Sequence, residues 1–223
     1  MSKILNLPKT DGDGIPYLSY SQVNTWKRSK RDYIRQYFLG EGFTGNAYTD
    51  FGSKVGEAIE NNDFSGFTSG EQDFLKTVPR YDEFEREIRL EFDGFFIKGF
   101  IDTNMLAEVG VGKKPFVPII ADYKTGDIAK KTAEYESDNY IQLEIYAAAM
   151  EQEYGILPNY AEVFLIGRSG NAFKGEKLKL TNEFITITRE ITEGKIKEVK
   201  QLLQDTAEEI SAYYTAYLKL NLT

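Results

Sequence analysis

The 223-residue sequence predicts an α/β domain in which a central mixed β-sheet is flanked by helices. Segments with helical periodicity stand near both ends of the chain, and alternating segments stand in its middle. A short apolar run, Ile119-Ile120-Ala121, has the composition of a strand that is buried on both faces. These three observations define the fold class, and the chain is long enough to bury one substantial core.

The first helix is predicted to begin at Ser19. Ser19 and Gln22 have the spacing of a capping box, and Leu18 and Val23 have the spacing of a hydrophobic staple. Residues 1–16 are rich in turn formers and are predicted to be a flexible segment, which leaves 17–223 as the folded domain. The other expected helices cover residues 48–61, 71–78, 139–153 and about 193–219.

The middle of the chain predicts the sheet. Residues 87–92 alternate in polarity, and Asp93-Gly94 is a hairpin signal that pairs them with a second strand at 95–102. Residues 117–124 form the apolar strand, which is therefore expected at the centre. Two further strands are expected at 160–166 and 183–191.

Composition excludes several kinds of chemistry. The chain has no cysteine and no histidine, which rules out disulfides, a thiolate zinc site, an iron–sulfur cluster and any histidine-based nucleophile. A metal site would have to be built from oxygen ligands, which suit Mg²⁺ or Mn²⁺.

The overall charge and hydropathy bear on location and partners. No segment approaches the roughly 18 apolar residues of a membrane span, and the N-terminus lacks the features of a signal peptide, so we expect a cytoplasmic protein without a membrane partner. The net charge of −8 argues against non-specific coating of DNA, although local charge decides contact.

The segment PIIADYKTG, residues 118–126, carries the first candidate site. Asp122 and Lys124 are two apart in a strand and share a face, while the carbonyl of Tyr123 can still face the site. Asp102 ends the neighbouring hairpin strand, so the two aspartates should meet. The acid-x-Lys pattern recurs at 193–195 and 198–200 as ordinary surface charge, and the tripeptide alone therefore leaves both interpretations open.

Two helices offer further candidates. Gln142 and Tyr146 are at i and i+4 and share one helix face, where a phosphate or the lysine could serve as partner for the glutamine. Glu57 and Glu60 lie on the helix predicted at 48–61. The alternatives are an ordinary amphipathic helix in the first case and exposed charges in the second.

Five segments, in the same order, resemble the motifs of one family. They are LSYSQVNTWKRSKRDYIRQY, FGSKVGEAIE, GFID, ADYKTG and QLEIYA. No single segment is specific, but the ordered set resembles the RecB-like branch of the PD-(D/E)XK nuclease superfamily. The resemblance implies a restriction-endonuclease-like core and a nuclease, in many relatives an exonuclease, that hydrolyses DNA in recombination, repair or phage DNA metabolism with Mg²⁺ or Mn²⁺.

Carried over by motif, the resemblance assigns roles to individual residues. Asp102 and Asp122 become metal ligands together with the Tyr123 carbonyl, and Lys124 becomes the catalytic lysine. Gln142 and Tyr146 become residues that position the phosphate or the lysine. DNA ends are the implied partner, with a recombination or helicase protein as a second.

Three positions depart from the family pattern. Gly56 stands where the family has a metal-binding histidine, so Glu57 or Glu60 is predicted to replace that ligand. Ser29 stands near a cluster cysteine of many relatives, in keeping with a chain that cannot hold an iron–sulfur cluster. Ile101 replaces the proline of the superfamily name. The missing histidine supports an alternative function, a catalytically impaired nuclease fold that binds DNA or recruits a partner.

Basic residues provide candidate contacts to DNA. Trp26, Tyr33 and Tyr37 are interleaved with one basic cluster and could stack on bases, but they are expected to lie mostly in the core. A purely structural or interaction protein is a third interpretation of the chain. The basic candidates are Lys27, Arg28, Lys30, Arg31 and Arg35 in the first helical region, and Lys130 and Lys131 after the ADYKTG segment.

Overall fold

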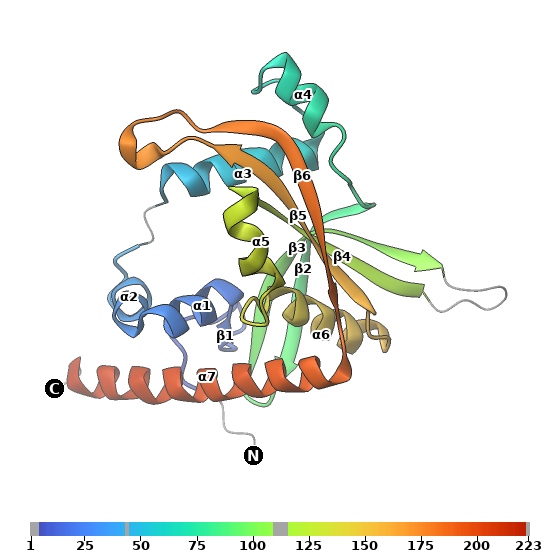
Figure 1. Cartoon of the computed structure of the whole chain (residues 1–223). Coiled ribbons are helices and arrows are strands. Elements are labelled where there is room, and N and C mark those ends of the chain that lie inside the picture. Colours follow the sequence, from blue (N-terminus) through green and yellow to red (C-terminus); the bar gives the residue numbers. More distant parts are fainter. Residues whose placement is uncertain (1–4, 43–44, 109–115, 222–223) are drawn as a thin grey trace.

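The computed structural model describes residues 5–42, 45–108 and 116–221, and it confirms the predicted class (Figure 1). A strongly twisted sheet has the strand order β1-β3-β4-β5-β6, with β2 paired to β3. The pairs β2–β3, β3–β4 and β5–β6 are antiparallel, whereas β1–β3 and β4–β5 are parallel, so the sheet is mixed and β4 is central as expected. The strands are β1 Tyr17–Leu18, β2 Glu83–Phe92, β3 Phe95–Glu108, β4 Phe116–Gly126, β5 Tyr160–Ser169 and β6 Lys179–Glu190.

Strand β3 has different neighbours along its length. On one edge, the first part of β3 pairs with β2. On the other edge, β3 pairs with β1 at Phe96 and Ile97, and with β4 only from Thr103 onward. Residues 98–102 therefore lie between β1 and β4 on that edge. This interval is where the site described below is located.

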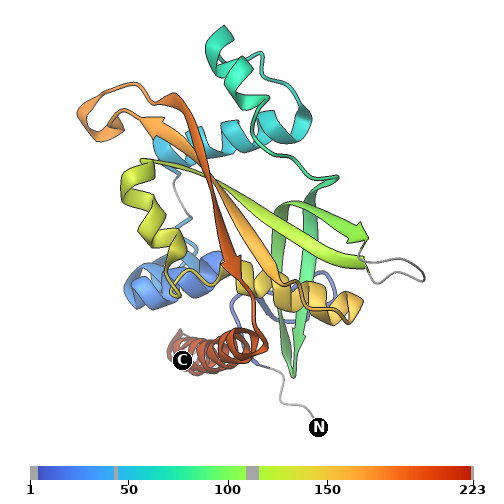
Figure 2. The same ribbon diagram turned by 45° about the vertical axis from the view of Figure 1, so that its right-hand side comes forward.

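Helices lie on both sides of the sheet (Figures 1 and 2). In Figure 1, α3 and α4 lie above the sheet, whereas α1, α6 and α7 lie below it, and α7 crosses the base of the molecule. The helices are α1 Tyr20–Arg28, α2 Lys30–Tyr33, the π-helical turn Ile34–Phe38, α3 Ala47–Asn61, α4 Ser69–Leu75, α5 Ile128–Glu136, α6 Gln142–Tyr154, the 3₁₀ turn Ala172–Lys174 and α7 Glu193–Asn221. No helix within the described ranges has both the length and the apolar character needed to cross a bilayer.

Ser19 caps α1 as predicted, because its hydroxyl accepts a hydrogen bond from the Gln22 amide. The buried Gln22 side chain accepts from the Tyr33 hydroxyl at 3.1 Å instead of completing the box. Helix α5 was not predicted. Its nine residues have a weak apolar pattern, and its start depends on the Asp127 side chain, which accepts from the Lys130 amide.

Two apolar clusters hold the layers together. The larger one packs α1, α6 and α7 against the sheet, with Trp26 and Tyr33 buried in it, so the expectation that these two rings are core residues is confirmed. The smaller one packs α3 and α4 against the sheet through residues that include Val55, Ile59 and Leu75.

The N-terminal segment differs from the prediction. Leu5 and Leu7 are 5% and 4% exposed and belong to the larger cluster. Between them, the Asn6 amide donates to the Ser211 hydroxyl of α7 at 2.8 Å. Residues 5–7 are thus packed because two alternating leucines face the core, whereas residues 9–15 are mostly exposed; residues 1–4 of the predicted flexible segment lie outside the described residues.

Candidate active site

Asp102 and Asp122 meet across β3 and β4, as the sequence predicts. The antiparallel register pairs Thr103 with Ala121, so the next pair outward is Asp102 with Asp122. Side chains at such opposed positions share a face and have Cβ atoms about 5 Å apart. The Tyr123 amide donates to Asp102 Oδ2 at 2.7 Å, which fixes the first carboxylate against the second strand.

Lys124 forms an ion pair with Asp122, which is completely buried, while the lysine side chain is 26% exposed. Burial lowers the pKa of Lys124, but the Asp122 and Asp102 carboxylates raise it by more, so the net pKa lies above its ordinary value. The lysine is therefore a fixed positive charge at neutral pH.

The start of α6 supplies the donors to Asp122. The Tyr140 hydroxyl lies 2.9 Å from Asp122 Oδ2 and 3.0 Å from Gln142 Oε1. Gln142 Nε2 donates to Asp122 Oδ1 at 3.2 Å and also to the Tyr146 hydroxyl, which confirms that the i, i+4 pair shares a face. The partner of the glutamine is thus Asp122 and not the lysine. The helix predicted at 139–153 begins only at Gln142, so Tyr140 lies in the connection before it, and this residue was not among the predicted site residues.

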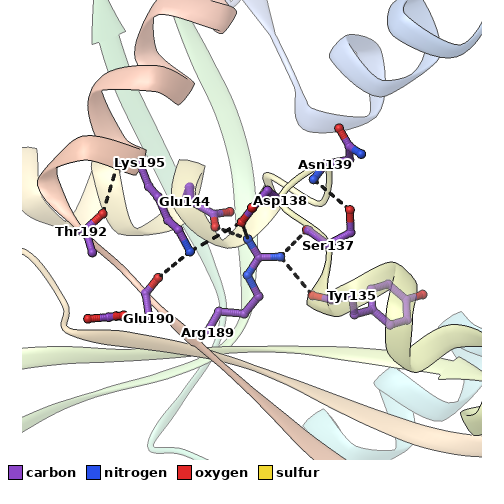
Figure 3. Close-up of polar contacts among 9 residues, drawn as sticks. All are labelled: Tyr135, Ser137, Asp138, Asn139, Glu144, Arg189, Glu190, Thr192 and Lys195. Atoms are coloured by element: carbon purple, nitrogen blue, oxygen red, sulfur yellow. Dashed lines mark hydrogen bonds and ion pairs between the residues drawn. The ribbon is translucent and has the colours of Figure 1, made fainter.

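The segment that carries Tyr140 is held by a buried arginine from β6 (Figure 3). Arg189 is 5% exposed, and its guanidinium donates to the carbonyl oxygens of Tyr135, at 3.1 Å, and of Ser137. It also donates to Glu144 Oε1 at 2.6 Å, and Glu144 lies on the first turn of α6. One buried cation thereby joins the end of α5, the connection and α6, which places the donors to Asp122.

An acidic cavity of about 540 Å³ opens on the α3 side of Asp102. Gly56, Glu57 and Glu60 of α3 line it, as does Glu85 of β2. A Cβ atom at Gly56 would meet no atom within 4 Å, so a side chain at position 56 would enter open space.

Glu85 is a cavity residue that the sequence did not single out. Its φ of +48° is left-handed, which is uncommon for a residue with a Cβ. Phe84 packs against the smaller cluster, whereas Ile88 belongs to the larger one, although even spacing would place both on one face. Regular alternation is therefore lost at this point of β2, and the adjacent residues Phe84 and Glu85 both line the cavity.

The charges of the site suit a divalent cation. Burial, and next the nearby Asp122 carboxylate, raises the pKa of Asp102 to about 8. Two adjacent carboxylates thus hold a proton that a bound cation would displace. In the part of the chain that the structure describes, no group of three or more acidic side chains is placed to hold a metal by itself. Mg²⁺ commonly needs only one or two carboxylates besides substrate phosphates, so the oxygen donors present fit this ion.

The basic residues predicted to bind DNA are distributed differently. Lys30 forms an ion pair with Glu209 of α7, and Arg35 pairs with Glu41 at 2.7 Å. Among the residues described, none of the five cationic residues from Lys27 to Arg35 lines a cavity that includes Asp102. Lys130 and Lys131 line a groove of about 970 Å³ whose lining includes Thr125, the residue after the catalytic-lysine candidate.

The mixed sheet, the opposed aspartates and the adjacent lysine define a nuclease with a restriction-endonuclease-like core. A family model described as the PD-(D/E)XK nuclease superfamily matches residues 65–217, more than half of the chain. The chain therefore belongs to the PD-(D/E)XK nuclease superfamily.

Solved structures share this fold at low sequence identity. An alkaline exonuclease from Laribacter hongkongensis is 13% identical, with a TM-score of 0.53 over 93% of this chain and 94% of its own. The same enzyme in complex with dAMP gives 12% and 0.51, with 92% of each chain covered. A Eubacterium rectale protein described as an exonuclease gives 13% and 0.53, with 92% and 83% covered. No curated protein matches the sequence.

Proposed function

We propose that this protein is an Mg²⁺- or Mn²⁺-dependent deoxyribonuclease that removes nucleotides from DNA ends. The observation that carries the proposal is the opposition of Asp102 and Asp122, with Lys124 paired to the second aspartate. The exonuclease assignments of the proteins that share the fold support action at ends. The acidic cavity and the open position at Gly56 support a metal site that faces α3.

Each group has a role in this proposal. Asp102, Asp122 and the Tyr123 carbonyl would hold the ion, which when bound supplies Lewis-acid chemistry at the scissile phosphate. The Lys124 ammonium orients the attacking water and stabilises the negative charge that develops on the phosphate. Tyr140 and Gln142 keep the Asp122 carboxylate in one orientation through their hydrogen bonds. Tyr146 holds the Gln142 amide.

The alternative is a catalytically impaired nuclease fold that binds DNA or recruits a recombination or helicase protein. The open position at Gly56 favours it, because a ligand of the family is missing there. Glu57, Glu60 and Glu85 line the same cavity and are the acids available to replace that ligand.

One assay separates these functions. We expect the purified protein to release mononucleotides from end-labelled linear DNA with Mg²⁺ or Mn²⁺ and to release none with EDTA. Covalently closed circular DNA should resist if the enzyme acts at ends, and RNA of the same sequence tests the sugar. Degradation that persists in EDTA, or no degradation with either metal, would contradict the proposed function.

Gly56→His should restore the missing ligand, because the structure leaves room for the side chain. We expect Mn²⁺ affinity to rise about tenfold, the scale on which single groups tune metal sites. Isothermal titration with Mn²⁺ measures this. Gly56→Ala is the matched control, since it removes the same helix-interior glycine and stabilises α3 by up to about 1 kcal/mol without adding a ligand. Equal Mn²⁺ affinities in the two variants would show that position 56 does not face the ion.

A further inference from the structure

Asp102 lies at the junction of two cavities of opposite chemical character. The acidic cavity described above is lined by three glutamates besides Asp102, and no lysine or arginine is among its described lining residues. The second cavity, of about 370 Å³, lies between α1 and β3, and Asp102 is the only acid among its described lining residues. Two lysines, Lys9 and Lys98, line it together with several aromatic rings. We call it the Phe100 cavity.

Phe100 lies beside the catalytic carboxylate. Lys98, Phe100 and Asp102 follow one another along β3 and line the same cavity. They lie in the interval of β3 between its pairing with β1 and its pairing with β4. On that edge no described strand is paired with them, and the start of α1 lies there instead. The Phe100 side chain is 43% exposed there, and the residue paired with it on β2 is the charged Glu87. Because the ring stays partly in water, its contribution to the free energy of folding is small.

Cations accompany the rings of this cavity. Lys98 Nζ lies 5.6 Å from the centre of the Phe100 ring and 3.0 Å from a Glu87 oxygen. On the opposite wall, Lys9 Nζ lies 5.6 Å from the centre of the Tyr37 ring. Aromatic faces with cations beside them are the combination by which proteins hold single-stranded nucleic acid, with bases stacked on rings and phosphates near lysines. Among the described lining residues of this cavity, Lys9 and Lys98 are the cations, and Lys98 also forms an ion pair with Glu87.

We propose that the Phe100 cavity binds one nucleotide of single-stranded DNA, with its base on the Phe100 ring and its backbone phosphate near Lys98 and Lys9. The proposal rests on the proposed function, because it places the adjoining phosphodiester at Asp102. The cavity has the size of a small-molecule site and accommodates a base that is not paired. The preferred substrate is therefore a single strand or an unpaired end, and a duplex must fray before it enters.

Binding of a short oligodeoxynucleotide tests this without cleavage. In EDTA, a fluorescein-labelled oligo(dT) measured by anisotropy should bind Phe100→Ala about tenfold more weakly than the wild type, the scale of one lost base stack. Phe100→Trp should restore the affinity, because the stacking face is retained. Lys98→Ala should weaken binding and reduce its salt dependence. Phe173→Ala is the matched control: Phe173 is 84% exposed on the β5–β6 connection, does not line this cavity, and should bind as the wild type does.

The outcomes separate the two proposals. If the wild type degrades DNA and Phe100→Ala binds oligo(dT) as well as the wild type does, the Phe100 cavity is not the nucleotide site while the nuclease assignment stands. If the wild type cleaves nothing with Mg²⁺ or Mn²⁺ but its oligo(dT) affinity depends on Phe100, the cavity binds DNA and the nuclease assignment fails. Equal loss of affinity in Phe100→Ala and Phe173→Ala would indicate general surface adhesion and overturn the inference.

Discussion

Lys124→Ala is expected to lower the rate of DNA cleavage about 10³-fold while leaving the fold intact. The expected loss of rate is this large because the substitution removes a preorganised positive charge that stabilises the transition state. Metal binding should behave differently from cleavage. Lys124 pairs with Asp122, the predicted metal ligand, and therefore competes with the ion for that carboxylate. Without the lysine, Mn²⁺ should bind as tightly as in the wild type or more tightly.

Single-turnover cleavage of an end-labelled oligonucleotide and titration with Mn²⁺ measure the two effects separately. Lys76→Ala is the control, because Lys76 is an exposed lysine at the end of α4 that forms its ion pair with Asp73. A cleavage rate within a few-fold of the wild type in Lys124→Ala would remove the lysine from the mechanism. Loss of cleavage accompanied by loss of Mn²⁺ binding would show that it acts only by supporting the metal site.

Asp102→Asn is expected to abolish cleavage and at the same time to stabilise the fold. Cleavage is lost because a neutral amide replaces a ligand carboxylate. The gain in stability follows from the pKa of Asp102, which burial and Asp122 raise to about 8 in the folded chain. Below about pH 4 the aspartate is protonated in both the folded and unfolded states. Between about pH 4 and pH 8, the aspartate is ionised in the unfolded chain but still protonated in the folded chain. The free energy of unfolding of the wild type therefore falls progressively over this range.

The stabilisation by Asp102→Asn should therefore be absent near pH 4 and largest above pH 8. Solvent reaches the side chain, which reduces the effect, and we expect about 2 kcal/mol at pH 8, or a rise in Tm of about 4–8 °C. Thermal unfolding in EDTA at several pH values measures it. Asp205→Asn removes an exposed carboxylate of α7 and should leave Tm nearly unchanged. A Tm difference that does not depend on pH would contradict the proposed cause.

Local patterns predicted the parts of the site that depend on strand pairing and helix periodicity. The Asp93-Gly94 turn and the alternation of β2 fixed the hairpin, and the apolar run fixed β4 beside it, so Asp102 and Asp122 could be placed together. Gln142 and Tyr146 followed from helical spacing. The same reasoning put Tyr140 inside the helix predicted at 139–153, whereas it lies in the connection before α6.

Contacts between distant segments were not predictable in this way. Lys30 belongs to a basic cluster in the sequence, but its partner is Glu209 on the last helix. Glu85 and its neighbour Phe84 both line the acidic cavity at a left-handed residue where β2 loses its alternation, and no sequence pattern marks that residue. Arg189 is a single cation in a strand, and nothing near it in sequence indicates that it binds the α5–α6 connection.

The buried pair of Arg189 and Glu144 constrains how descendants of this chain can diverge. Loss of Arg189 alone leaves the buried Glu144 carboxylate without its cation, which costs about 3–5 kcal/mol. Loss of Glu144 alone costs less, because Arg189 keeps two carbonyl acceptors and its ion pair with Asp138. Arg189 should therefore change only together with Glu144. A chain in which both became apolar could remain as stable, but the carbonyl oxygens of Tyr135 and Ser137 would lose their donor. Such a protein would keep its fold, but the connection that carries Tyr140 would be less firmly fixed. The hydrogen bond from Tyr140 to Asp122 would then be less well positioned.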